Sequence, residues 1–339
     1  MGSKRFIGLM SVATVLLMVL AAFAAVPAGA GDEKFEVVVL FKDSIDEQVI
    51  KNNNGKISKK YSAIPAAVTK LTAKDMKSLE KSDKVLSVEK NYVYSIATPP
   101  PGRGKPPKDD PDPPSSPSQV LPWGVDRIDA EYVWEDESTP FTGEGITVAV
   151  IDTGIDKDHP DLEANIIGGK NFVRKGRKLD TDAWDDDNGH GTHVAGTIAA
   201  IDNDIGVIGV APGASLYGIK VLNRRGSGYM TDVMDGIEWA ATVNVGDDIS
   251  PDYVDVVSMS LSGPHSDALL AAIDYAYGKD IIIVAASGND DGSPVSYPAA
   301  YTNVISVGAT DKNDIVADFS NYDDNLDLVA PGVSVYSTY

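Results

Sequence analysis

Three polar side chains stand at or just beyond the ends of apolar segments, where they could carry out acid–base chemistry. Asp152 closes the run ITVAVID, His190 lies between two glycines in NGHGTH, and Asn289 comes shortly after the run IIIVAA. A carboxylate can orient an imidazole, an imidazole can take up and return a proton, and a side-chain amide can donate to a developing oxyanion. Each residue also has a structural explanation, since Asp and Asn commonly form turns and a single His is more often structural than catalytic.

The histidine spacing raises a second possibility, a metal site. His190 and His193 are three residues apart, and the only other histidines are His159 and His265. The sequence contains no H-E-x-x-H motif and no cysteine, which argues against zinc. The absence of cysteine also excludes disulfides, a thiol nucleophile and thiolate metal sites.

The elements that must position these side chains form an α/β pattern between Gln119 and Tyr339. Short apolar strands alternate with amphipathic helices, which predicts a parallel sheet flanked by helices. The predicted strands are 146–151, 215–221, 254–261, 281–286 and 304–307, and the predicted helices are 190–201, 230–244 and 266–278. In such sheets a binding site forms beyond the carboxyl ends of the strands, which is where Asp152 and Asn289 stand.

The first 30 residues have the pattern of a signal peptide. Lys4 and Arg5 precede an apolar run from residue 6 to 26, and Ala28-Gly29-Ala30 is a small-x-small cleavage site. Cleavage there would make the protein secreted. The alternative is an uncleaved segment that anchors the protein in a membrane.

Residues 31–97 predict a small α+β domain, and residues 98–118 predict a linker. Residues 35–41 and 67–71 read as strands, 43–52 and 72–81 as helices, and 85–93 as a further alternating strand. The stretch from Pro99 to Pro117 is rich in Pro, Ser, Gly and Asp and cannot bury a core. We expect it to be exposed and to contain a processing region.

The acidic balance of the chain limits its partners. Lys and Arg number 29 against 50 Asp and Glu, a formal net charge of -21 in 339 residues. Nucleic acid is therefore not expected as a partner, because its backbone requires a basic surface. We expect the acidity to serve solubility, the binding of cations such as Ca²⁺, or both.

The order and local contexts of the candidate residues resemble the subtilase family of serine proteases. Asp152 precedes His190 in the chain, which is the order of these residues in subtilisin. The resemblance covers nearly all of 119–339. It rests on the segments VIDTGID, NGHGTHVAGTIAA, IGVIGVAP, VSMSL, AASGND, YPA and VAPG.

This resemblance implies a role for each of the three residues. Asp152 would hold the imidazole tautomer, His190 would act as general base and then general acid, and Asn289 would donate to the oxyanion. The protein would then be a secreted endopeptidase that hydrolyses polypeptides through an Asp-His-Ser triad.

The resemblance also implies which backbone segments hold an extended polypeptide substrate. A peptide would be held by strand addition, a mode that accepts many sequences. The family usually has Gly at the position of Ser262. The implied substrate-binding residues are Ser260, Leu261, Ser262 and Gly263 on one side and Gly226, Ser227 and Gly228 on the other.

A structural Ca²⁺ site is implied in the same way. Its oxygen donors include a single carboxylate, which suits a hard cation, although ordinary turns would explain the same residues. The implied ligands are Gln119, Asp161 and Asn203 with the carbonyls of Ile201, Ile205 and Val207. A second acidic cluster is either another Ca²⁺ site or a solvated loop, and it comprises Asp180, Asp182, Asp185, Asp186 and Asp187.

The family's serine segment, G-T-S-x-A/S-x-P, is expected beyond Gly332 and does not occur before Tyr339. We therefore expect the catalytic domain to be incomplete at its C-terminal end and the chain as written to be inactive and poorly stable. The alternative is a dead fragment or pseudoprotease that only binds or inhibits. Residues 31–97 resemble the family's propeptide, an intramolecular inhibitor and folding chaperone, and the protein is expected to be a monomer.

Overall fold

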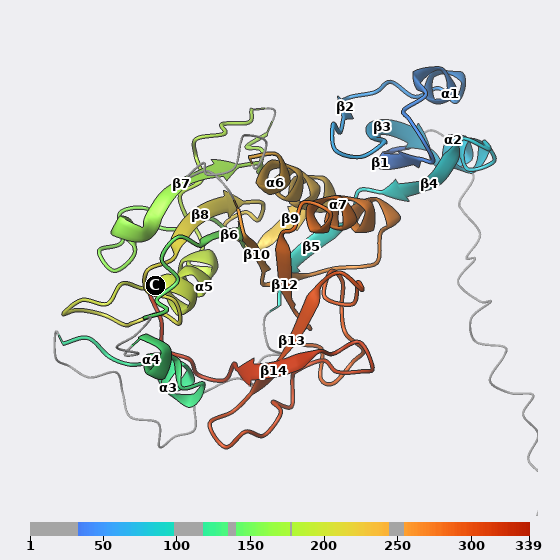
Figure 1. Ribbon diagram of the computed structural model, residues 1–339. Coiled ribbons are helices and arrows are strands. Elements are labelled where there is room, and N and C mark those ends of the chain that lie inside the picture. The colour runs from blue at the N-terminus through green and yellow to red at the C-terminus, as the bar shows by residue number, and fades with distance from the viewer. Residues whose placement is uncertain (1–32, 98–117, 135–139, 177, 244–253) are drawn as a thin grey trace, which may run out of the picture.

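The computed structural model describes residues 33–97, 118–134, 140–176, 178–243 and 254–339 (Figure 1). The predicted signal peptide and nearly all of the predicted linker lie outside these residues. Among the described helices, none combines the length and apolarity that crossing a membrane requires.

The larger unit, which begins at residue 118, is built on a parallel sheet of seven strands in the order β14-β13-β12-β10-β6-β8-β7. All five predicted strands are present in it, with ends shifted by a few residues. The strands are β6 (Thr147–Asp152), β7 (Ile166–Asn171), β8 (Ser215–Lys220), β10 (Val256–Met259), β12 (Ile282–Ala286), β13 (Ile305–Thr310) and β14 (Leu328–Pro331). This confirms the predicted α/β class.

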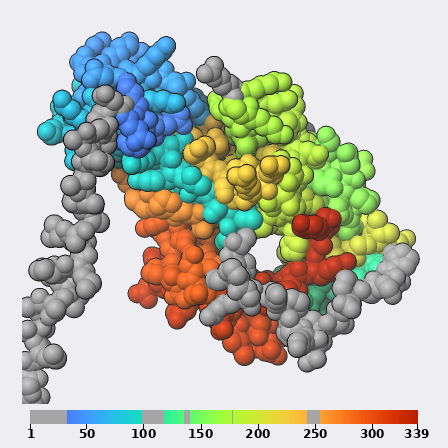
Figure 2. Space-filling model, turned by 180° about the vertical axis from the view of Figure 1, so that it is seen from behind, coloured from blue at the N-terminus to red at the C-terminus, as the bar shows by residue number. Residues whose placement is uncertain are grey.

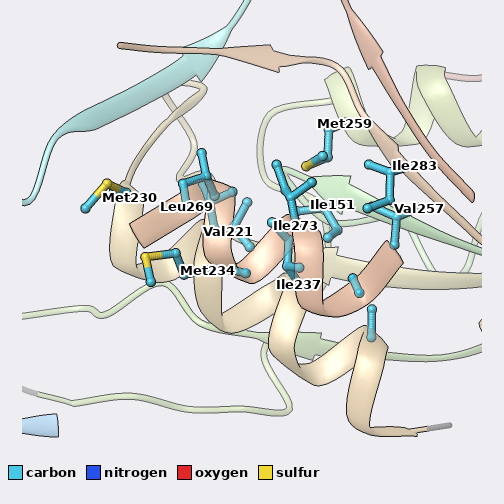
Figure 3. Close-up of a cluster of buried hydrophobic side chains, with 14 of the residues drawn as sticks. Ile151, Val221, Met230, Met234, Ile237, Val257, Met259, Leu269, Ile273 and Ile283 are labelled. Atoms are coloured by element: carbon cyan, nitrogen blue, oxygen red, sulfur yellow. The ribbon is translucent and has the colours of Figure 1, made fainter. Parts of the chain in front are cut away.

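Helices cover both faces of this sheet. Val148 and Val150 of β6 face α5 (His190–Ala199), whereas Ala149 and Ile151 face α6 (Met230–Val243) and α7 (Asp267–Tyr277). Figure 3 shows Ile151 in the second of these cores, among side chains of α6, α7 and neighbouring strands. Successive strand residues point to opposite faces, so one buried strand supplies both cores. Two short helices, α3 (Trp123–Arg127) and α4 (Ala130–Trp134), precede β6.

Strand β7 was not predicted from the sequence, because IIGGKN contains two glycines and a lysine. The structure explains the glycines. Gly169 pairs with Gly218 of β8, and a Cβ atom on Gly169 would lie 2.3 Å from the Trp184 ring. The indole occupies the space that side chains of two adjacent strands would otherwise fill.

The N-terminal unit, residues 33–97, has an antiparallel sheet in the order β2-β3-β1-β4. Its elements are β1 (Lys34–Phe41), α1 (Glu47–Asn52), β2 (Lys59–Lys60), β3 (Ala66–Thr72), α2 (Ala73–Leu79) and β4 (Val85–Lys90). The predicted helix 43–52 was too long at its start. Asp46 accepts hydrogen bonds from the amides of Gln48 and Val49, so it caps a helix that begins at Glu47.

Strand β1 is buried on both faces, which explains its nearly unbroken apolar sequence. Val37 and Val39 pack with α1 and α2, whereas Val38 and Leu40 belong to the core shared with the larger unit. The sheet of the N-terminal unit therefore rests on α7. Figure 2 shows the two units in contact, with the blue N-terminal unit beside the larger body.

The prediction of one strand over 85–93 was wrong, because the segment divides. The chain leaves β4 at Lys90 and forms a separate strand, β5 (Val93–Ile96). This strand lies antiparallel between β9 (Ser227–Tyr229) and β11 (Leu261–Ser262) of the larger unit. Figure 1 shows β5 beside β9. The predicted strand 254–261 divides likewise, because β10 pairs with parallel neighbours and β11 with an antiparallel one.

Candidate active site

Asp152 and His190 meet at the carboxyl end of the large sheet. Asp152 is the last residue of β6, and His190 is the first residue of α5. The imidazole Nδ1 lies 2.8 Å from Oδ1 and 2.9 Å from Oδ2 of Asp152. The Asp152 side chain is fully buried, whereas that of His190 is 26% exposed. This arrangement fixes Nδ1 as the donor and leaves Nε2 to exchange a proton.

Backbone contacts hold Asp152 in place. The amide of Thr153 donates to Oδ1 of Asp152 at 2.7 Å. The amides of Val221 and Leu222 donate to its carbonyl at 2.9 and 3.0 Å. A buried carboxylate without partners would be costly, so its bonds with the Thr153 amide and the His190 ring make its burial tolerable. The Thr153 hydroxyl in turn accepts a bond from the amide of Gly191, next to His190.

The loop before His190 is held by Asp186. Its Oδ1 accepts from the amides of Asn188 and Gly189, and its Oδ2 accepts from the amide and hydroxyl of Thr192. Burial raises the pKa of Asp186, but the bonds from Gly189, Thr192 and Asn188 outweigh it, so the pKa lies below its ordinary value. A carboxylate charge at the start of α5 is also favourable to the helix.

The pKa of His190 is raised above its ordinary value. Burial lowers this pKa, but the hydrogen bond and charge of Asp152, together with the charge of Asp186, outweigh that effect. A neutral imidazole is needed to accept a proton, so this base becomes competent as the pH rises through the raised pKa.

Asn289 lies three residues after the end of β12 and already donates to a peptide carbonyl. Its Nδ2 is 2.6 Å from the carbonyl oxygen of Ala97, the residue that follows β5. An amide that donates to the carbonyl of an extended strand is placed to donate more strongly when that oxygen becomes negative.

The two predicted substrate-binding segments hold β5 from both sides. On one edge Ser95 pairs with Ser227, and the amide of Ile96 donates to the carbonyl of Gly226 at 2.9 Å. On the other edge Ser95 pairs with Ser262. β5 is thus the middle strand of a three-stranded sheet, and its backbone pairs on both edges with segments of the larger unit.

The remaining predicted residues of these segments lie around the same strand. Gly228 pairs with Tyr94, and Leu261 pairs with Ile96. A Cβ atom on Gly263 would lie 2.5 Å from the Tyr94 ring, so glycine is required for this ring to fit. Tyr94 is fully buried, and its hydroxyl donates to the carbonyl of Pro264.

A cavity of about 540 Å³ adjoins the end of β5. His190, Asn289 and Ala97 line it together with Ser260, and further apolar side chains of α5 and β12 complete its wall. The imidazole, the amide and the end of the bound strand therefore face one space.

The residues predicted to bind calcium form one cluster. Gln119 Nε2 donates to the carbonyls of Ile201 and Val207 at 2.6 and 3.1 Å. Asn203 Nδ2 donates to Asp161 Oδ1 at 3.0 Å, and Asp161 Oδ2 accepts from the amide of Val207 at 2.8 Å. Asp161 is 1% exposed.

These donors fit a hard cation better than a transition metal. If the Gln119 amide is rotated by half a turn, its oxygen faces the carbonyl oxygens of Ile201 and Val207. All three atoms are then oxygen ligands of the kind that Ca²⁺ prefers. Ile205 lies in the same loop, and its amide donates to Asn203 Oδ1. Over the described ranges, no group of three or more His, Cys, Asp or Glu residues is suited to a metal, so this site would depend on one carboxylate.

The second acidic cluster consists of side chains with separate partners. Asp186 caps the loop before α5, Asp187 pairs with Lys220, and Asp185 accepts from the amide of Lys157. His193, the other candidate zinc ligand, places Nε2 3.1 Å from a backbone carbonyl, that of Val335.

Sequence reasoning missed Thr153 and Tyr94, and it placed Asp186 in the acidic cluster without its role in holding the loop before His190. Thr153 and Asp186 stand beside motif residues, where a turn or cap function could have been inferred. Tyr94 carried no such indication, because its position depends on how β5 leaves the N-terminal unit.

Comparison with known proteins agrees with this geometry. Residues 143–339 match the Subtilase family. Subtilisin NAT of Bacillus subtilis subsp. natto is 36% identical over 348 aligned positions, which cover 99% of this chain and 81% of that protein. Subtilisin DY of Bacillus licheniformis is 46% identical over 227 positions, covering 66% of this chain and 76% of that protein.

A third relative, the thermostable alkaline protease of Halalkalibacterium halodurans, is 37% identical over 339 aligned positions that cover 99% of this chain and 81% of that protein. The similarity therefore extends over the N-terminal unit as well as the large sheet. The chain belongs to the subtilase family of serine endopeptidases.

Proposed function

We propose that this protein hydrolyses polypeptides through a triad of which Asp152 and His190 are the acid and the base. A serine hydroxyl would attack a peptide carbonyl carbon while His190 Nε2 takes its proton. His190 then gives that proton to the leaving amine, and water hydrolyses the acyl-enzyme in the same manner. The described residues assign no nucleophile; because His190 lines the cavity, the serine would approach Nε2 from that side.

One observation carries this proposal: Asn289 donates to the carbonyl of Ala97, at the end of a strand clamped on both edges. A substrate held like β5 would place its reacting carbonyl at this amide and beside His190. The substrate class is therefore an extended polypeptide, and Asn289 would stabilise the oxyanion.

The same geometry supports a propeptide role for residues 31–97. Strand β5 fills the substrate-binding position and blocks it. Glu89 accepts hydrogen bonds from the Ser266 hydroxyl and the Asp267 amide at the start of α7, and Glu238 accepts from the amides of Ser62 and Ala63. We infer that the N-terminal unit inhibits the site from within the chain and that processing cuts after Ala97.

The domain limits follow from this proposal: 1–30 a cleaved signal peptide, 31–97 the propeptide, 98–118 the linker and 119–339 the catalytic domain. The protein would act outside the cell as a monomer. We further propose that Gln119, Asp161 and Asn203, with the carbonyls of Ile201, Ile205 and Val207, bind a structural Ca²⁺ ion that fastens residue 119 to the loop after α5.

The test is active-site labelling with a fluorophosphonate probe, which reacts only with an activated serine. Protein that carries the family's G-T-S-x-A/S-x-P segment is expected to take up one probe per molecule and to cleave a fluorogenic peptide. His190→Ala should abolish both. An unlabelled, inert product would refute the proposal and favour a pseudoprotease.

A further inference from the structure

A buried lysine stands directly behind the Asp152–His190 pair and has no role in the reaction described above. Lys220 is the last residue of β8, where it pairs in register with Asp152 of β6. It is only 3% exposed. A buried ammonium group is costly unless it is paired and its protons are satisfied, so its neighbours should show why it is kept.

All three protons of the Lys220 ammonium have an acceptor. Nζ donates to the carbonyl of Thr153, to the carbonyl of Leu222 at 3.1 Å and to Asp187 Oδ1 at 2.6 Å. Thr153 directly follows Asp152, and the amide of Leu222 donates to the Asp152 carbonyl. Two of the three bonds therefore fix the backbone around the catalytic acid.

The third bond reaches the segment that carries the base. Asp187 precedes His190 by three residues, and its side chain is 40% exposed. The ammonium thus connects the chain around the acid with the chain leading to the base. The far end of the same loop is held separately, by the Trp184 ring in the space above Gly169 and Gly218.

We propose that Lys220 is a positioning residue that, through Asp187, holds the His190 loop at hydrogen-bond distance from Asp152. The inference rests on the proposed roles of Asp152 and His190. Lys220 itself touches neither substrate nor the reacting atoms. It acts by fixing the 2.8 and 2.9 Å contacts between imidazole Nδ1 and the carboxylate.

The pKa of His190 reports these contacts without any turnover. It is raised because the bond and charge of Asp152 outweigh burial, with Asp186 adding to the effect. His193 also interacts electrostatically with the ring, and burial lowers the pKa of His193. A looser pair would let the pKa of His190 fall towards its ordinary value.

Lys220→Met distinguishes the loss of positioning from the loss of a nearby positive charge, because the two change the pKa of His190 in opposite directions. Removing a nearby positive charge by itself raises the pKa of an imidazole. Loss of positioning lowers it. The experiment is a titration of the His190 ring protons by NMR in the full chain, with circular dichroism to check folding. Lowering of the His190 pKa in Lys220→Met is the expected result, and an unchanged or raised pKa would overturn the proposal.

Asp187→Glu provides a second variant that is expected to fold, because the side chain is partly exposed. It keeps the charge of the loop and changes only the length of the link, so any change in the His190 pKa reports geometry. We expect the pKa to fall here too, and an unchanged value would count against the proposal even if Lys220→Met does not fold.

Lys84→Met is the matched control, since it breaks the exposed pair with Asp46 far from the site and should leave the His190 pKa unchanged. The titration needs no nucleophile. It can therefore fail while fluorophosphonate labelling succeeds, which would leave the proposed function standing without this role for Lys220.

Discussion

The hydroxyl of Tyr94 should contribute far more free energy to the docking of β5 than an exposed hydroxyl on the neighbouring strand does. Tyr94 is fully buried and donates to the Pro264 carbonyl. Burial raises the pKa of Tyr94, so the group stays a protonated donor. Tyr94→Phe leaves that carbonyl without its donor, a cost of about 1–3 kcal/mol. Tyr94→Ala also removes the ring from its place against Gly263, and about 3–5 kcal/mol is expected.

The assay is amide hydrogen exchange at Ile96, whose N–H donates to the Gly226 carbonyl at 2.9 Å and is released only when β5 lifts away. Since about 1.4 kcal/mol corresponds to tenfold, Tyr94→Phe should speed exchange by about 5- to 150-fold and Tyr94→Ala by more than about 100-fold. The matched control is Tyr229→Phe on β9, where the side chain is 54% exposed and the cost should stay within about 0.5 kcal/mol. Equal acceleration by Tyr94→Phe and Tyr229→Phe would refute the reasoning.

Further predictions concern the site and its supports. Asp152→Asn removes the charge that raises the pKa of His190, so the rising limb of the kcat/KM profile should move to lower pH, and kcat should fall by about 10⁴, as for this change in a serine protease triad. Asn289→Ala should lower kcat by about 10²–10³ with little change in KM, the loss known for subtilisin's oxyanion donor. Added Ca²⁺ at 100 times its Kd should increase the free energy of unfolding by about 2.7 kcal/mol and so raise the melting temperature. Asp161→Asn should remove this rise in calorimetry. Gly154→Ala should cost at least about 1–3 kcal/mol in chemical denaturation, because φ is +104° and a Cβ atom would lie 2.2 Å from the Trp184 carbonyl.

Five of the seven strands of the large sheet could be predicted because they depend on local patterns. Apolar runs of five or six residues separated by amphipathic helices are typical of parallel strands buried on both faces. Asp152 and Asn289 follow two such runs, and the sheet brings the ends of parallel strands to one edge. Their proximity was therefore a consequence of the fold class.

The division between β4 and β5 could not be predicted, because the alternation in residues 85–93 fits one long strand as well as two short ones. What divides it is the position of the larger unit. The backbone of β9 and β11 offers two edges to β5, and a strand in the small sheet could not reach both. Tertiary context of this kind overrides local preference.

The buried position and the partner of Lys220 could not be predicted for a related reason. A lysine at the end of an apolar strand ordinarily extends its charged end into water. Here the ammonium is instead surrounded by two carbonyls and a carboxylate, and Asp187 is 33 residues away in sequence. Nothing in the local pattern of β8 indicates that partner.

The sequence motifs around Asp152 and His190 contact each other directly. A Cβ atom on Gly191 would lie 2.1 Å from the carbonyl oxygen of Gly154, and the Gly191 amide donates to the Thr153 hydroxyl. The chain after Asp152 and the start of α5 thus touch backbone to backbone, which only glycine permits at this distance. Gly191 is therefore required by the 2.8 Å approach of His190 to Asp152. A methyl group at this position would separate the acid from the base before it altered any catalytic atom.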